Sequence, residues 1–194
     1  MEEKLSSKIY TEIRKDILEG KYQPRDFLSE AQIAAKYEVS KAPVKEALHI
    51  LADQGYLISY PRRGYMVNTY SDYEIDDIQE IRKTLESLCV RLAIKHASDQ
   101  DIESLRFYKN ADDNNLDPRE TINSKFHVGL ARISGNPFLP DTLQPLVNKA
   151  SMSQIKGTSD TDHFDKILDA MLKRDEKEAL YWLDKDIRYL RRDK

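Results

Sequence analysis

Three side chains able to bind nucleic acid recur at helical spacing between residues 41 and 49. Lys41, Lys45 and His49 stand at i, i+4 and i+8, so in a helix they form one stripe. A lysine in the major groove can donate to guanine O6 and N7, and a helix N-terminus presents free N–H groups to a phosphate. Arg62 and Arg63 form a second basic group. Because a lysine stripe alone is also typical of a solvated helix surface, its interpretation depends on the surrounding elements.

The elements around this stripe predict a helix-turn-helix. Isoleucines every four residues over 9–17, followed by Gly20, indicate an amphipathic helix with a glycine stop. Residues 29–32 (Ser-Glu-Ala-Gln) form a capping box that begins a short second helix. After a tight turn, Ser40 caps a third helix whose apolar positions are Val44, Ala47, Leu48 and Leu51. Two short helices joined by a tight turn are the signature of this motif.

A hairpin with a basic tip follows Gly55. Residues 56–60 are rich in β-formers, residues 61–64 (Pro-Arg-Arg-Gly) predict a turn, and β character resumes at 65–67. A helix-turn-helix followed by such a hairpin predicts a winged helix. In that setting the basic stripe and the arginine tip favour DNA binding over a merely solvated surface.

The composition predicts a mainly α protein of 194 residues, with only 6 glycines and 7 prolines. The single cysteine, Cys89, cannot form an internal disulfide, which fits a reducing cytoplasm. No apolar run approaches the ~20 residues of a membrane span, so no membrane partner is expected. Because the formal net charge is −3, DNA binding must depend on where the charges lie.

The chain after residue 74 predicts an all-helical bundle of about six helices. The expected helices run from Tyr73 to about Ala97, from Ser98, from Asp117 through Phe126, from about Leu143 to Ile155, from His163 to Lys173 and from Glu176 to Arg192. Ile75, Ile78, Ile81, Leu85, Leu88 and Leu92 supply the apolar period of the first. Six helices are enough for a closed bundle with a cavity. The expected domains are therefore 1–68, a linker at 69–74, and 75–194.

From about Ile9 to Val67 the chain resembles the GntR regulators. The resemblance rests on residues 28–30, 33–34 and 39–48, with Leu51, Gly55 and residues 62–65 in register. It implies that residues 41, 42 and 45 contact base edges or phosphates and that residues 62–64 form the wing tip. Lysine replaces the family's usual arginine at 41 and 45, which loses the planar fork that grips guanine. The expected DNA-binding residues are Ser40, Lys41, Ala42, Lys45, His49, Arg62, Arg63 and Gly64.

Residues 76–190 resemble the FCD effector domain found in one branch of that family. The motifs are 81–86 (Ile-Arg-Lys-Thr-Leu-Glu), Phe126-His127 with 134–137 (Ser-Gly-Asn-Pro), and 167–170 (Ile-Leu-Asp-Ala) with Asp175 and Ala179. The resemblance implies a helical domain that binds a small-molecule effector and forms the dimer.

Many FCD domains hold a divalent cation with an Asp and a His at i, i+4 and two further His. Here Asn123 stands at the Asp position, His127 at the first His, Phe164 at the second and Asp186 at the last. Asn supplies no carboxylate and Phe cannot ligate, so no metal cofactor is expected. The remaining candidate ligands are His127, His163 and Asp186. The alternative is a satisfied polar pocket built by His127 and Asn123.

The resemblance also implies an effector site containing Arg82, Asn123 and His127. Arg82 can bind a ligand carboxylate through two hydrogen bonds. The alternative is an internal ion pair between Arg82 and Glu86 at i+4.

These observations predict a homodimeric transcription regulator, most simply a repressor, that binds a double-stranded DNA operator. Its effector is expected to be an organic acid or sugar acid. No nucleophile elbow, glycine-rich phosphate loop or complete metal motif supports an enzyme. Two alternatives stay open: an architectural DNA-binding dimer without ligand sensing, and a metal-dependent hydrolase that uses His127.

Overall fold

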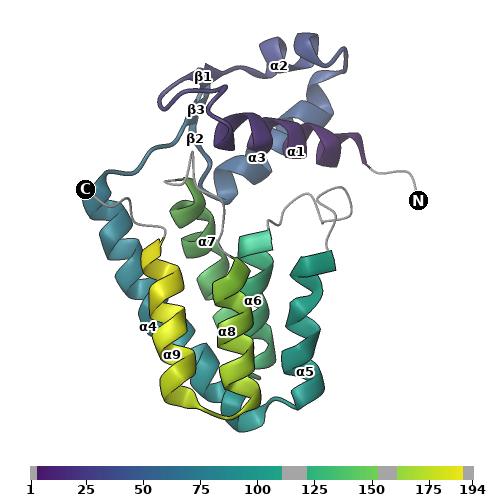
Figure 1. The fold of residues 1–194 in the computed structure, drawn as a ribbon. Coiled ribbons are helices and arrows are strands. Elements are labelled where there is room, and N and C mark those ends of the chain that lie inside the picture. Colours follow the sequence, from purple (N-terminus) through teal and green to yellow (C-terminus); the bar gives the residue numbers. More distant parts are fainter. Residues whose placement is uncertain (1–3, 111–121, 153–160, 190–194) are drawn as a thin grey trace.

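The N-terminal part of the chain is a winged-helix head that stands on a helical bundle (Figure 1). The computed structural model describes residues 4–110, 122–152 and 161–189. The head contains α1 (Leu5–Leu18), β1 (Phe27–Leu28), α2 (Glu30–Lys36), α3 (Lys41–Asp53), β2 (Leu57–Tyr60) and β3 (Gly64–Val67). The predicted helix-turn-helix and wing are confirmed.

The wing sheet has one strand more than the sequence predicts. Its strands are antiparallel in the order β1-β3-β2, with Tyr65 of β3 opposite both Leu28 and Ser59. Because β1 is only two residues long, it carries no alternating pattern from which a strand could be predicted. The extra strand attaches the hairpin to the segment that precedes α2.

The core of the head lies between α1 and α3, which pack against each other. Ile13, Val44 and Leu51 are fully buried there, as their helical spacing predicts. Gly20 has a φ of 73°, consistent with its predicted role in ending the first helix. The α3 apolar face thereby fixes which of its other side chains point to solvent.

The second unit contains six α-helices among the described residues, in agreement with the predicted bundle. In chain order they are α4 (Asp72–His96), α5 (Asp99–Ser104), followed by a 3-10 turn (Leu105–Asn110), then α6 (Ile122–Ile133), α7 (Leu139–Met152), α8 (Thr161–Leu172) and α9 (Glu176–Tyr189). Figure 1 shows α4 running the length of the bundle beside α9. The shared core includes Val90, Phe126, Leu143, Phe164 and Ile167, all fully buried.

Several predicted boundaries differ from the structure. A Ser71 capping box starts α4 at Asp72, inside the expected linker of 69–74. The expected helix start at about Leu143 is too late, because α7 already begins at Leu139 and contains Pro145. Proline inside a helix removes one i→i−4 hydrogen bond, and here the helix continues past it. The predicted helix start at Asp117 and the ends at Ile155 and Arg192 lie outside the described residues.

The apolar period predicted for α4 does not coincide with the face that α4 buries. Ile75 and Ile78 are buried, but Ile81 is 50% and Leu88 40% exposed. The bundle side of the helix instead carries Arg82, Glu86, Cys89, Val90 and Ala93. The apolar stripe of Ile81, Leu85, Leu88 and Leu92 therefore lies at the edge of the buried face: Ile81 and Leu88 are exposed, whereas Leu85 and Leu92 are half-buried and pack against the bundle core.

Candidate nucleic-acid interface and buried polar centre

The outward face of α3 carries the predicted basic stripe. Val44, Ala47 and Leu48 are fully buried in the head, and the helix period leaves Lys41, Lys45 and His49 exposed on the other side. Ala42 is exposed beside them, at the beginning of the helix. His49 lies 3.8 Å from Asp53, but both side chains are largely solvated, so this ion pair is weak. The face is thus open to a ligand.

No side chain of the N-cap residue hydrogen-bonds to the first backbone N–H groups of α3. Ser40 is the N-cap residue, as predicted, and has extended backbone angles, but its side chain makes no capping hydrogen bond. In contrast, Ser29 and Gln32 close the N-terminus of α2 with a reciprocal capping box. The first N–H groups of a helix need an outside partner, and a phosphate oxygen satisfies them well.

The two exposed lysines of α3 differ from other lysines of the head. Lys21 and Lys36 lie 2.8 and 2.9 Å from the carboxylate of Asp16. Burial alone would raise the pKa of Asp16, but the hydrogen bonds from both lysines outweigh it and lower that pKa. Within the described residues, Lys41 and Lys45 have no such acidic partner. Their charges are consequently available to phosphates or base edges.

The wing tip is shaped by backbone that favours glycine. Gly64 has a φ of 104°, and an added Cβ would lie 2.6 Å from the carbonyl oxygen of Leu28. Arg62, two residues before Gly64, also has positive φ, at 67°. Arg63 lies 5.0 Å from the centre of the Phe27 ring, a cation–π distance, while remaining exposed. Gly64 therefore positions the wing, and the two arginines present charge at its tip.

A second polar group is buried inside the bundle, where α4 supplies an ion pair. Arg82 Nε donates to Glu86 Oε1 at 2.9 Å, and both side chains are fully buried. Arg82 Nη1 donates to Gln79 Oε1 at 3.0 Å. Arg82 therefore forms the internal ion pair with Glu86 that the sequence offers as the alternative to a ligand-binding role. Arg82 Nη2 is nevertheless buried without a hydrogen-bond partner among the described residues.

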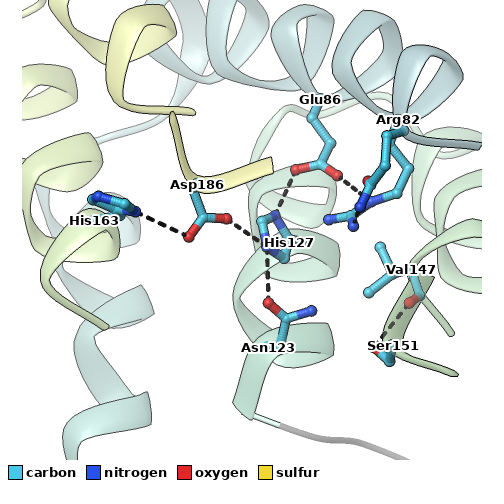
Figure 2. Close-up of polar contacts among 9 residues, drawn as sticks. Arg82, Glu86, Asn123, His127, Val147, Ser151, His163 and Asp186 are labelled. Carbon is cyan, nitrogen blue, oxygen red and sulfur yellow. Dashed lines mark hydrogen bonds and ion pairs between the residues drawn. The ribbon is translucent and has the colours of Figure 1, made fainter. Parts of the chain in front are cut away.

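His127 of α6 joins this pair to the last helix (Figure 2). Its Nδ1 is 2.5 Å from Glu86 Oε2, and its Nε2 is 3.1 Å from Asp186 Oδ2 of α9. Burial by itself lowers the pKa of His127, but the charge of Glu86 and the contacts with Glu86 and Asp186 leave it raised. Burial conversely raises the pKa of Glu86, while His127 and Arg82 lower it overall.

Asn123 and His163 complete the centre from opposite sides. Asn123 Oδ1 lies 3.2 Å from His127 Nε2, and the Nδ2 of this buried amide has no partner among the described residues. The mostly buried His163 has its Nδ1 3.8 Å from Asp186 Oδ1. The structure thus brings the expected effector residues Arg82, Asn123 and His127 into one chain of contacts. The spacing predicts Asn123 with His127 on α6, whereas the bridging position of Glu86 follows only from the packing of α4 on α6.

The arrangement does not fit a divalent metal. At the position that a second histidine would occupy, Phe164 is fully buried and stacked on Phe126 at 3.9 Å. At the position that the resemblance implies for an aspartate, Asn123 offers a neutral amide oxygen, which lacks the charge that helps to hold a divalent cation. Throughout residues 4–110, 122–152 and 161–189, no three His, Cys, Asp or Glu side chains are grouped to hold a metal.

The fold agrees with what comparison with known proteins shows. Residues 5–67 match the model of the bacterial regulatory proteins of the gntR family, and residues 77–188 match the FCD domain. The chain therefore belongs to the GntR family of bacterial transcription regulators, in the branch that carries an FCD domain. This class contains regulators rather than enzymes, so the hydrolase alternative is not supported.

Individual relatives are similar over most of the chain. A Bacillus subtilis protein described as an uncharacterized HTH-type transcriptional regulator, YdhC, is 30% identical over 70% of this chain and 63% of its own length. The Escherichia coli HTH-type transcriptional repressor RspR is 27% identical over 78% of this chain and 68% of its own. This chain thus spans less than two thirds of the Bacillus relative.

Solved structures show the same fold. E. coli McbR/YncC superposes with a TM-score of 0.70 at 19% identity, covering 96% of this chain and 95% of that one. In the part of the chain that is described, no helix has the length and apolar character needed to cross a membrane.

Proposed function

We propose that the chain binds a double-stranded DNA operator as a homodimer and represses transcription until a small-molecule effector binds the helical domain. The observation that carries this proposal is the outward face of α3. Lys41 and Lys45 are exposed there without acidic partners among the described residues, at the open N-terminus of the second helix of a helix-turn-helix. That helix is the one which enters the major groove in this motif.

The wing adds a second contact to the same DNA. Arg62 and Arg63 are exposed at the tip of the hairpin, on the same domain as the α3 face. Arginines of this kind contact phosphates or the minor groove, and each phosphate contact makes binding weaker in salt. Binding is thus proposed to depend on local charge in a chain whose net charge is −3.

Selection from random double-stranded DNA tests operator binding directly. The full chain is expected to enrich a two-fold symmetric sequence with half-sites about one helical turn apart or closer, because a symmetric dimer reads a palindrome. Enrichment without symmetry would contradict the dimer, and absence of any enrichment at low salt would contradict DNA binding.

We assign the dimer interface to the apolar stripe of α4. Ile81, Leu85, Leu88 and Leu92 recur at i, i+4, i+7 and i+11, the spacing of a seam between two helices. Large apolar side chains such as Ile81 and Leu88, in line on one helix and 40–50% exposed, favour association with an equally apolar surface. A second copy of the chain supplies that surface by symmetry and brings two winged helices to one operator.

The proposed effector site is the polar centre of the bundle. Arg82 Nη2 and Asn123 Nδ2 are buried donors without partners among the described residues. Buried donors of this kind are costly unless they bind an acceptor, which an organic acid or sugar acid supplies. A thermal-shift screen of small acids tests the site: a compound that stabilises the wild-type chain but not Arg82→Lys supports it.

One observation favours the second candidate, an architectural dimer without ligand sensing. Glu86 already neutralises Arg82 inside the bundle. If no acid or sugar acid changes the melting temperature, and DNA affinity is the same with every compound, the architectural function is the better account.

A further inference from the structure

The side chain of Phe27, in strand β1, lies on the outward face of the wing sheet. The next residue, Leu28, is buried in the head, whereas Phe27 is 41% exposed. Successive side chains of a strand point to opposite faces, so the two residues cannot share the core. Because hydrophobic stabilisation scales with the apolar area that is buried, the Phe27 ring contributes little to the core of the head.

The Phe27 ring contacts two side chains of the β2–β3 hairpin. Its centre is 5.6 Å from the centre of the Tyr60 ring, and the two ring planes are inclined at 57°. The guanidinium carbon of Arg63 lies 5.0 Å from the centre of the Phe27 ring, over its face. Since β1 and β2 flank β3 in the sheet, the two rings meet across the central strand. One arginine of the wing tip is therefore placed on an aromatic pair that the two outer strands supply.

The backbone of the turn fixes Arg63 relative to this ring. The N–H of Arg63 donates to the carbonyl oxygen of Tyr60 at 3.0 Å. The next residue, Gly64, approaches β1 so closely that an added Cβ would lie 2.6 Å from the carbonyl oxygen of Leu28. The turn is thus held against β1, which makes Phe27 and Arg63 neighbours.

Contact with a ring leaves the hydrogen-bond donors of Arg63 available. Within the part of the chain that the structure describes, Arg63 has no acidic partner. A ring accepts a guanidinium on its face, whereas a carboxylate would occupy some of the N–H donors, which lie in the guanidinium plane. The Phe27 ring can therefore restrict where the Arg63 side chain lies and still leave those donors free for phosphate oxygens.

We propose that Phe27 is a positioning residue for DNA binding, whose ring holds the Arg63 guanidinium at the wing tip for contact with a phosphate of the operator. A free arginine loses rotamer freedom when it contacts a ligand, and part of that loss is avoided where the side chain is already held in place. The proposal rests on the proposed function, and it gives β1 a role in binding that the helix-turn-helix and the hairpin do not by themselves require.

NMR of the full chain with ¹³C-labelled arginine, without DNA, tests the contact itself. Protons over the face of an aromatic ring are shifted upfield, so the δ-methylene protons of Arg63 are expected upfield of those of Arg62. Their loss in Arg63→Ala assigns them, and Phe27→Leu should abolish the difference. Equal shifts for the two arginines in the wild-type chain would overturn the proposal, whether or not the chain binds DNA.

Fluorescence anisotropy with the selected operator tests the effect on binding. Phe27→Leu keeps an apolar side chain and removes the ring face. A cation–π contact at an exposed site converts to about a 2- to 5-fold change in Kd, so Phe27→Leu should weaken binding by about that factor. Phe27→Tyr keeps the ring and should bind like wild type. Wild-type affinity in Phe27→Leu would overturn the proposal.

Ile58→Ala is the matched control for the loss of an exposed apolar side chain. Ile58 and Phe27 both pair with Met66, from opposite sides, so they share one face of the sheet, and Ile58 is 37% exposed. The Ile58→Ala variant should bind the operator like wild type. A loss equal to that of Phe27→Leu would show that any apolar side chain of this face serves, and would overturn the role of the ring.

Double-mutant cycles separate the positioning of Arg63 from a general distortion of the wing. In an Arg63→Ala background, adding Phe27→Leu should weaken binding no further, whereas in Arg62→Ala it should cause its full loss. A distorted turn would couple Phe27 to both arginines, and full additivity with Arg63→Ala would uncouple it from Arg63. Either result would overturn the proposal.

Failure of this proposal can be distinguished from failure of the proposed function. A wild-type chain that binds no operator would contradict both. Binding that is weakened by Arg63→Ala but not by Phe27→Leu would contradict the role of Phe27 alone and leave operator binding intact.

Discussion

The side chain of Lys149, near the end of α7, lies against Gly55 of the winged-helix head. A Cβ added at Gly55 would be 3.6 Å from Lys149 Cγ and Cε. Met152, one turn further on, is buried with the hydrophobic core of the head, although it belongs to a bundle helix. Ala150 of the same turn packs with Ile75 and Ile78 of α4. The last turn of α7 therefore belongs to both units and connects them mechanically (Figure 1).

This junction predicts that head and bundle unfold together. The only tryptophan, Trp182 of α9, reports on the bundle, while far-ultraviolet circular dichroism reports on all helices. The two urea transitions should coincide in the wild-type chain. Met152→Gln places a polar group in the head core and should destabilise the head by about 1–3 kcal/mol. The two probes should then separate.

Phe138→Gln is the matched control for this experiment, because Phe138 is 79% exposed and directly precedes the first residue of α7, at the other end of that helix from Met152. It should leave both transitions in place. Coincident transitions in Met152→Gln, at an unchanged midpoint, would show that the α7 contact does not stabilise the head.

The wing tip predicts a difference between two glycine substitutions. Gly64→Ala combines positive φ with a contact of 2.6 Å to the backbone of Leu28, which cannot move freely. Gly135→Ala has positive φ as well, but nothing lies within 4 Å of the added Cβ. Backbone strain alone is worth about 1–2 kcal/mol. Urea unfolding should show a larger loss for Gly64→Ala, and equal losses would mean that the wing shifts to relieve the contact.

The apolar stripe of α4 predicts the effect of charge on assembly. Ile81→Glu with Leu88→Glu should convert the dimer to a monomer, because two carboxylates on each chain would face each other across a two-fold seam. Sedimentation at micromolar concentration measures the change. Tyr73→Glu, at an 85% exposed residue of the same helix, is the control and should stay dimeric. A dimeric double variant would place the interface elsewhere.

The sequence predicts the head well because each of its signals is local. The isoleucine period, the Ser29 capping box and the Pro-Arg-Arg-Gly turn act within a few residues. The α4 helix shows the limit of such reasoning. Its most regular apolar period points partly outward, through Ile81 and Leu88, while Arg82 and Glu86 point inward. A charged pair is buried only because His127 and Asp186 arrive from other helices, and spacing along α4 carries no information about them.

The buried centre predicts a stability maximum in mildly acidic solution. The pKa of His127 in the folded chain is raised above 6.5. Its contribution to the free energy of unfolding is therefore complete below pH 6.5 and is lost as the pH rises through that raised pKa. The pKa of Glu86 in the folded chain is lowered below 4.5. Its contribution to the free energy of unfolding is therefore present above pH 4.5 and is lost as the pH falls through that lowered pKa. Stability should thus decline above pH 6.5 and below pH 4.5.

Urea midpoints across pH measure this dependence. His127→Gln should flatten the alkaline decline, whereas His49→Gln should keep it, because His49 is exposed. An alkaline slope unchanged in His127→Gln would assign the decline to other groups.

The central claim, that α3 reads DNA, is tested most directly by fluorescence anisotropy with the selected operator. Lys45→Ala removes an exposed charge from the recognition face, and Lys95→Ala removes one from the exposed end of α4 in the bundle. A base or phosphate contact is worth about 1–3 kcal/mol, so Lys45→Ala should weaken binding about 5- to 150-fold at an unchanged melting temperature. Lys95→Ala should bind like wild type. Equal affinities of Lys45→Ala and wild type would contradict the assigned DNA-binding face.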